Sequence, residues 1–320
     1  MKSFDEIYEE IEEEFNKVDE LDEEKNNEDK NDSFKKIWNK IKKEFNKIKK
    51  DRTSLIIFII VAVIIFYLCR NIIATIIMFI PLILIIRFFS KAFKNVEKEK
   101  ARYKEKVVNK LIKNYSNKLF YYPKEGVSFQ DYKESTFKYY NSFSSEDLIE
   151  GTIANNCRIK MSEIHILDET TDNEGNTKTR TMFLGLFAKI TLSHNSNTSF
   201  KIQKNETLSD TFKKKDKLDM DSTEFEKIYD VLTEDKISTL RILTSDIMQN
   251  LVDFKVKNKV TPEIVLTNDN LYIRLDVGSV FEPKSLNKLD RESIEETYNL
   301  INFVFDLVEA FSNNILEFEK

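Results

Sequence analysis

Residues 153–192 read IANNCRIKMSEIHILDETTDNEGNTKTRTMFLGLFAKITL. Apolar side chains recur at nearly every second position on both sides of a polar segment, residues 170–176, which is rich in Asn, Asp and Gly. A period of two is typical of strands, and such a polar segment is typical of a hairpin turn. The stretch therefore predicts two long antiparallel strands, the second covering residues 179–192.

The remainder of the C-terminal half alternates between strand and helix patterns. Strands are predicted at residues 200–203, 225–232, 263–267 and 271–277, and helices at 245–257 and 290–317. This order predicts an α+β fold with an antiparallel sheet and packed helices over residues 148–320. Residues 91–147 are predicted to form a juxtamembrane helix and then an aromatic-rich connection, which Pro123 and Gly126 interrupt.

Two apolar runs, residues 55–69 and 72–86, are separated by Arg70 and Asn71. Each would form a helix of about 22 Å at 1.5 Å per residue. Lysine and arginine are abundant on both sides, so the positive-inside rule predicts a transmembrane hairpin over residues 53–90 with both termini cytosolic. One long tilted helix would bury Arg70 in the membrane, and a cleaved signal peptide would begin closer to the N-terminus. The predicted location is the cytoplasmic membrane, as a multi-pass protein.

The first 52 residues form a charged arm that contains an internal repeat. Residues 3–18 are acidic, residues 33–50 are basic, and their apolar positions coincide at helical spacing. Both copies are therefore predicted to be amphipathic helices. The acidic copy has three open alternatives: pairing with the basic copy as in a coiled coil, exposure to solvent, or packing on the C-terminal domain.

The basic copy has the composition of an interfacial helix that binds anionic lipids of a bilayer. The residues predicted to contact a membrane surface are Phe34, Trp38, Phe45, Lys42, Lys43, Lys49 and Lys50.

Composition excludes several kinds of site. The two cysteines and two histidines have no zinc spacing, and glycine-rich phosphate loops are absent from the sequence. We therefore predict no catalytic residues, no metal and no cofactor. The lysine clusters of the C-terminal half are short and interleaved with acids, so nucleic acid is not an expected partner.

Five segments carry a resemblance to a known family. They are Tyr122-Pro123, SEDLIEG at residues 145–151, MSEIH at 161–165, FLGLF at 183–187 and RILTS at 241–245. From about Phe93 to the end, the chain resembles the bacterial family called domain of unknown function 3137, and the preceding apolar hairpin is similar too. The resemblance implies a membrane location and the extent of the domain, and it supplies no activity.

The predicted function is a membrane-anchored cytosolic binding or scaffold module that recognises a protein partner or anionic lipid, or forms a homo-oligomer. The alternative is a membrane-anchored enzyme that uses Glu146, Asp147 and Glu163, because paired carboxylates in a cleft are suited to acid–base chemistry. His165 and Gly185 complete the candidate surface. His165 is expected to face away from its apolar strand neighbours, and Gly185 to permit close approach of another element or of a ligand.

Overall fold

The computed structural model describes residues 2–26, 60, 63–64, 72–171, 177–205, 216–284 and 289–318. The chain divides into two compact units, Met1–Glu12 with Lys100–Lys320, and Glu13–Glu99. The sheet and the candidate site belong to the first unit.

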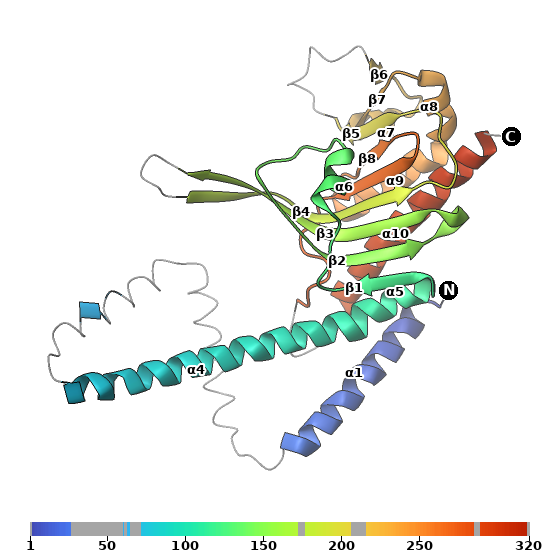
Figure 1. Cartoon of the computed structure of the whole chain (residues 1–320). Helices are drawn as coiled ribbons and strands as arrows, with labels where there is room; N and C mark the ends of the chain where they lie inside the picture. Colours follow the sequence, from blue (N-terminus) through green and yellow to red (C-terminus); the bar gives the residue numbers. More distant parts are fainter. Residues whose placement is uncertain are drawn as a thin grey trace. The chain divides into compact units, whose positions relative to one another are not determined.

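The first unit is built on a nine-stranded sheet in the order β1-β2-β3-β4-β9-β8-β5-β7-β6, in which every pair is antiparallel (Figure 1). The strands are β1 (Leu119–Tyr122), β2 (Ser142–Thr152), β3 (Arg158–Thr171), β4 (Thr177–Thr191), β5 (Phe200–Lys204), β6 (Lys217–Leu218), β7 (Tyr229–Thr233), β8 (Glu263–Leu266) and β9 (Asn270–Leu275).

The α-helices are α1 (Phe4–Asn26), α4 (Ile72–Tyr103), α5 (Asn109–Tyr115), α6 (Phe129–Glu134), α7 (Thr223–Ile228), α8 (Lys236–Ile242), α9 (Ser245–Asn258) and α10 (Arg291–Phe318). A π-helix, Lys104–Val108, joins α4 to α5, and a 3-10 turn, Ala154–Asn156, joins β2 to β3.

Both faces of the sheet carry a hydrophobic core, and the two cores differ in size. The larger core joins α5, α9 and α10 to one face through side chains such as Leu111, Leu251 and Ile301. The smaller core lies under α6 on the other face, around Tyr132, Phe187 and Tyr272. In Figure 1, α10 lies behind the sheet and α6 in front of it. The groove described below lies on the α6 side of the sheet.

β3 and β4 continue beyond the rest of the sheet as a two-stranded ribbon, which projects in Figure 1. In the ribbon, Asp168 pairs with Arg180 and Thr170 pairs with Lys178. Its exposed side chains are polar, so the ribbon contributes nothing to either core.

The sequence patterns located the strands β4, β5, β8 and β9 and the helices α9 and α10 to within a few residues. The long strand expected from about Leu148 is divided by the 3-10 turn into the end of β2 and β3. Two further differences concern the sheet. β1 and most of β2 lie in a stretch expected to be a loop, and residues 225–232, expected to be a strand, contain the end of α7 and the start of β7. Ser222 causes the second difference, because its hydroxyl caps α7 by accepting a hydrogen bond from the Phe225 N–H.

One part of the predicted fold class, the transmembrane hairpin, is wrong. Within the described ranges, no helix is both long enough and apolar enough to cross a bilayer. α4 is one continuous helix of 32 residues whose last third, from Phe93, is rich in Lys, Arg and Glu, so its apolar residues do not form a separate spanning helix. The predicted multi-pass location, and the membrane and transmembrane descriptions that depended on it, are therefore wrong. Most of the other apolar run, residues 55–69, lies outside the described residues.

The acidic copy of the N-terminal repeat forms the first part of α1. Ile7, Tyr8 and Ile11 are buried in the larger core, so this part of the helix packs on the C-terminal domain. The basic copy, including its seven predicted membrane-contacting residues, lies outside the described residues.

Candidate functional site

A groove of about 530 Å³ crosses the first four strands of the sheet on the side of α6. Its volume is within the range of ligand sites in proteins. The lining residues are Phe120 from β1, Glu150, Gly151 and Thr152 from β2, Arg158, Ile159 and Lys160 from β3, Lys189 and Thr191 from β4, and Asp131 from α6.

Strand register brings these side chains together. Lys160 lies opposite Glu150 on one side and opposite Lys189 on the other. One pair further along, Arg158 lies opposite Thr152 and Thr191. Since side chains two positions apart share a face, the two rows form one polar surface.

α6 forms a wall of the groove and is held in place at both ends. Its first turn is capped by Ser128, whose hydroxyl oxygen accepts from the Asp131 N–H at 3.0 Å. Its buried Tyr132 packs edge-on against Phe187, with ring centroids 5.2 Å apart. The Tyr132 hydroxyl donates to the Lys138 carbonyl at 2.8 Å and accepts from Arg274 at 2.9 Å.

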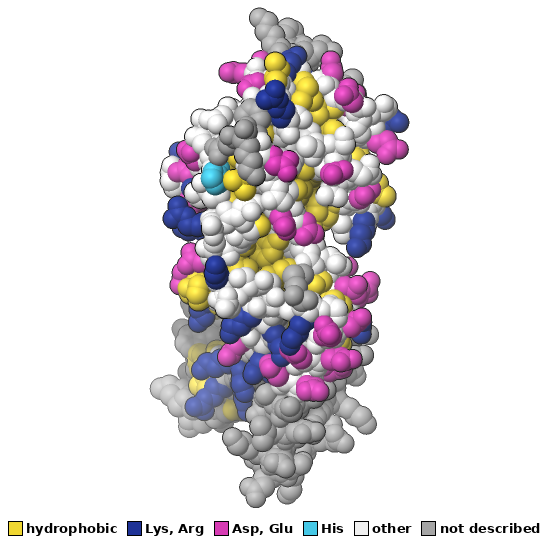
Figure 2. Space-filling model, turned by 90° about the vertical axis from the view of Figure 1, so that its right-hand side faces the viewer, with side chains coloured by type: hydrophobic (Ala, Val, Ile, Leu, Met, Phe, Trp, Pro, Cys, Tyr) yellow, Lys and Arg dark blue, Asp and Glu magenta, His cyan; other side chains and the backbone are white. Residues whose placement is uncertain are grey.

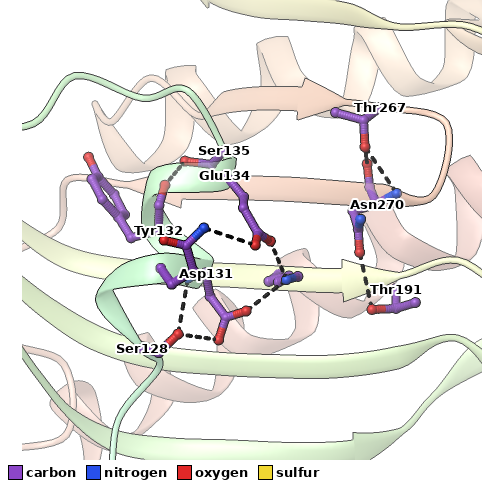
Figure 3. A network of polar contacts seen from close by, with 10 residues as sticks. Ser128, Asp131, Tyr132, Glu134, Ser135, Thr191, Thr267 and Asn270 are labelled. Carbon is purple, nitrogen blue, oxygen red and sulfur yellow. Dashed lines mark hydrogen bonds and ion pairs between the residues drawn. The ribbon is translucent and has the colours of Figure 1, made fainter.

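Lys189 of β4 forms ion pairs with two carboxylates of α6. Its ammonium donates to Asp131 and to Glu134, each at 2.7 Å (Figure 3). Burial alone would lower the pKa of Lys189, but these two hydrogen bonds outweigh it and raise the pKa above its ordinary value. For Asp131, burial is outweighed by the hydrogen bonds from Lys189 and Ser128, and the pKa is lowered. All three groups are therefore charged at neutral pH.

Arg158 and Lys160 are the other two cations that line the groove. Both are exposed, and within the described part of the chain neither forms an ion pair. Lys160 also lies directly opposite Lys189, which is an unfavourable arrangement of like charges. An anion bound above this row would reduce the repulsion. Phe120, which is 55% exposed, adds an apolar contact at the β1 side.

A polar network closes the groove beyond Thr191. The Thr191 hydroxyl donates to the Asn270 side-chain oxygen at 3.1 Å. Asn270 is fixed in turn by Thr267, whose hydroxyl exchanges two hydrogen bonds of 3.1 Å with the Asn270 backbone (Figure 3). The groove floor therefore ends at a rigid turn between β8 and β9.

The predicted carboxylates do not lie in this groove. Asp147 and Glu146 lie beside Lys104, at the start of the π-helix, and Glu282 completes the cluster. The Lys104 ammonium is 2.7 Å from Asp147, 2.9 Å from Glu282 and 3.7 Å from Glu146. Asp147 has a φ of +62° at a register shift in β2, which turns its side chain inward.

The charges of the cluster follow from burial. Asp147 is fully buried, and burial raises its pKa to about 6 although Lys104 and Tyr121 donate hydrogen bonds to it. Glu282 is more exposed, so hydrogen bonds from Lys100 and Lys104 outweigh burial and lower its pKa. Burial alone would lower the pKa of Lys104, but hydrogen bonds to Asp147 and Glu282 raise it.

Glu146, Asp147 and Glu282 place carboxylate oxygens within 4.8 Å of one another, a spacing that suits a metal ion. The Lys104 ammonium contacts all three and supplies the positive charge that a metal would provide. The arrangement is therefore an internal ion cluster that joins the π-helix, β2 and the segment before α10.

The other predicted residues have separate environments. Glu163 accepts hydrogen bonds from the Val280 N–H at 2.7 Å and the Ser279 hydroxyl at 3.2 Å, so it holds the segment after β9. His165 lies 3.1 Å from the Thr181 hydroxyl on the neighbouring strand. Gly185 packs against the backbone, since a Cβ there would lie 2.0 Å from the Leu275 carbonyl oxygen. These three residues take part in packing and in strand contacts.

Sequence reasoning missed the residues of the groove. Arg158, Lys160 and Lys189 were not among the candidate residues. The signal was available in part, because residues 158 and 160 are both basic on one face of a predicted strand. Which residues lie opposite them depends on register, which one sequence does not give.

A known protein family matches part of the chain, from β4 to α10. Residues 181–313 match the family described as "Protein of unknown function (DUF3137)". The predicted resemblance is thereby confirmed over these residues. Comparison with curated proteins and with solved structures gives no match.

The DUF3137 match begins inside β4 and ends inside α10. It includes Lys189, Thr191 and Asn270, but Arg158, Lys160 and α6 precede it. The groove is therefore built from residues on both sides of the start of the DUF3137 match.

Proposed function

We propose that this domain is a protein-binding module and that the groove over β1–β4 receives an acidic segment of a partner protein. The observation that supports this most strongly is the pair Arg158 and Lys160, which are exposed, adjacent on one face of β3 and without an ion pair in the described residues. Cations presented in this way favour binding of carboxylates.

The shape and lining of the groove suit a short peptide segment. The exposed Phe120 offers an apolar contact beside the two cations. Asp131 and Glu150 in the lining disfavour a uniformly anionic ligand such as nucleic acid. An acidic segment that also carries an apolar residue fits this combination.

The protonation states favour binding over acid–base catalysis. The pKa of Lys189 is raised, and the pKa values of Asp131 and Glu134 are lowered. A general acid or base works best with a pKa near the working pH, and these shifts move all three groups away from neutrality. Asp147, whose pKa is about 6, has no exposed surface on which a substrate could be bound.

Binding of a defined peptide tests the proposal. A fluorescent peptide containing one Phe and four Glu would be compared with the same peptide carrying Gln in place of Glu, by fluorescence anisotropy with the full chain. We expect the Glu peptide to bind at least about tenfold more tightly, and Arg158→Glu with Lys160→Glu to remove the preference.

The matched control reverses two exposed cations of the ribbon, Lys178→Glu and Arg180→Glu, which changes net charge equally. Equal loss of binding in both double variants would show that net charge, and not the groove, attracts the peptide. Absence of any preference for the Glu peptide would contradict the proposal.

A further inference from the structure

The first part of α1 packs against both α5 and α10, away from the site described above. The surface that these two helices present to α1 is called the α5–α10 groove below. Ile7, Tyr8 and Ile11 are buried in the same core cluster as Leu111 of α5 and Ile301 of α10. Phe4 packs on Tyr298 of α10, with ring centroids 5.4 Å apart. The apolar stripe of the helix is thus in direct contact with the domain.

The start of the helix is fixed by polar contacts. The Ser3 N–H donates to the Glu6 carboxylate at 2.8 Å, and the Glu6 N–H donates to the Ser3 hydroxyl at 3.4 Å, which is a capping box. Asn114 of α5 accepts from the Lys2 N–H at 3.2 Å and donates to the Lys2 carbonyl at 3.4 Å. These contacts define where the helix begins in the groove.

Two cations of the groove contact acids of α1. Arg291 of α10 forms an ion pair with Asp5, and its guanidinium lies 5.6 Å from the Phe4 ring centroid and 5.0 Å from that of Tyr8. Lys110 of α5 lies 3.3 Å from Glu10. Hydrogen bonds from Lys2 and Lys110 lower the pKa of Glu10. The groove is therefore complementary to the helix in charge as well as in shape.

The second copy of the repeat has the same apolar pattern with the opposite charges. Thirty positions after Phe4, Ile7, Tyr8 and Ile11, the sequence has Phe34, Ile37, Trp38 and Ile41. At the positions of Asp5 and Glu10 it has Lys35 and Lys40. In the same groove, these lysines would meet Arg291 and Lys110, so two attractions would become two repulsions.

We propose that the α5–α10 groove is a binding site for acidic amphipathic helices, in which Arg291 and Lys110 admit residues 3–12 and reject the basic repeat. Its ligand is a helix with apolar residues at positions 1, 4, 5 and 8 and acids at positions 2 and 7, the pattern of α1 from Phe4 to Ile11. An acidic helix of this pattern from a partner protein competes with α1 for the groove.

The contacts of α1 with the domain are limited enough for another helix to replace it. The part of α1 that belongs to the domain ends at Glu12. Its ion pairs are at the surface, where Asp5 is 73% and Arg291 54% exposed. Exposed pairs contribute little, and short helices have marginal stability on their own.

Peptide binding to the full chain tests this inference. The variant Ile7→Asp with Ile11→Asp removes the apolar contacts of the chain's own helix and empties the groove. Labelled peptides of residues 2–19 and residues 32–49 would be titrated against it by fluorescence anisotropy. We expect the acidic peptide to bind at least about tenfold more tightly than the basic one, and more tightly to this variant than to the unaltered chain, in which α1 competes.

Charge reversal gives the decisive comparison. With Lys110→Glu and Arg291→Glu added, the preference is expected to reverse in favour of the basic peptide. The matched control is Lys227→Glu with Lys236→Glu, two exposed lysines outside the groove, and it is expected to keep the original preference. A circular dichroism spectrum like that of the unaltered chain would verify folding of each variant.

If the aspartate variant does not fold, the same charge reversals in the chain that keeps α1 replace it, with each peptide now competing against that helix. Equal affinity for the two peptides, no binding of the acidic peptide, or a preference that the reversals leave unchanged would overturn the inference.

Discussion

Lys104 connects three segments through its single charge. It begins the π-helix, and its ammonium contacts Asp147 of β2 and Glu282 ahead of α10. Lys104 is 6% exposed and Asp147 is fully buried, so neither charge is hydrated enough to be stable alone. Removing one partner of such a pair leaves an uncompensated buried charge.

Lys104→Met is therefore expected to destabilise the domain by about 3–5 kcal/mol at pH 8. Urea unfolding followed by circular dichroism measures this. Lys100→Met is the matched control, since Lys100 contacts Glu282 from a side chain that is 39% exposed, and its loss should cost about 1 kcal/mol or less. Equal losses from both variants would contradict a special role for Lys104.

The cost of Lys104→Met should shrink as the pH is lowered from 8 to 5. The folded-state pKa of Asp147 is already raised to about 6, and loss of the ammonium raises it further above the unfolded value. A carboxyl with a raised folded pKa destabilises the fold by an amount that grows from the unfolded pKa up to the folded pKa, so the penalty is largest above the folded pKa and falls on acidification. Unfolding curves at pH 5 and pH 8 test the sign, and a loss that grows on acidification would contradict it.

Gly185 and Gly278 provide a prediction about backbone packing. A Cβ at Gly185 would lie 2.0 Å from the Leu275 carbonyl oxygen, whereas at Gly278 it would meet open space at a φ of +76°. Gly185→Ala is expected to cost about 3 kcal/mol or more because the backbone must move. Gly278→Ala is expected to cost about 1–2 kcal/mol from the left-handed backbone alone. Thermal unfolding of the two variants would show the order, and a reversed order would contradict it.

At the scale of elements, α6 controls the charge of the groove. Its Asp131 and Glu134 pair with Lys189, so the groove presents two of its three cations. Asp131→Asn with Glu134→Gln would release Lys189 and increase the affinity for the acidic peptide by about threefold or more. Anisotropy titration measures this change. Unaltered or weaker binding would show that Lys189 does not face the ligand.

How far the sequence predicts these elements depends on the regularity of each pattern. α9 and α10 have uninterrupted helical periods, and β8 and β9 are apolar runs on either side of a polar turn, so their positions were predictable. The first half of β2 contains the consecutive polar residues Ser144, Ser145 and Glu146, and the bulge at Asp147 breaks its alternation, so it resembled a loop. β1 is followed at once by Pro123, so it was taken as part of the aromatic-rich connection.

The groove was less predictable than the elements that build it. Lys160 and Lys189 are 29 positions apart, and only the register of β3 and β4 places them opposite each other. The partners of Glu163 were unpredictable for a similar reason, since Ser279 and Val280 lie more than 110 positions away. Contacts of this kind require the tertiary structure.

At the scale of the whole molecule, α1 should detach without unfolding the domain. Its contacts with α5 and α10 involve a few side chains, while the sheet has cores on both faces. Ile11→Asp is therefore expected to increase hydrogen exchange in α1 to the rate of an unprotected helix and to leave β3, β4 and β9 unchanged. Mass spectrometry of exchanged peptides measures both regions. Faster exchange in the strands would show that α1 is part of the same cooperative unit.

The ribbon of β3 and β4 has a consequence for modifying the chain. Because side chains alternate along each strand, removing the two facing pairs Thr170–Lys178 and Thr171–Thr177 leaves a tip pair that points to the same side as the present one. Removing one facing pair would leave a tip pair that points to the opposite side. The ribbon is therefore a suitable place to attach a purification tag or a dye, and its length is best changed by two residues per strand at a time.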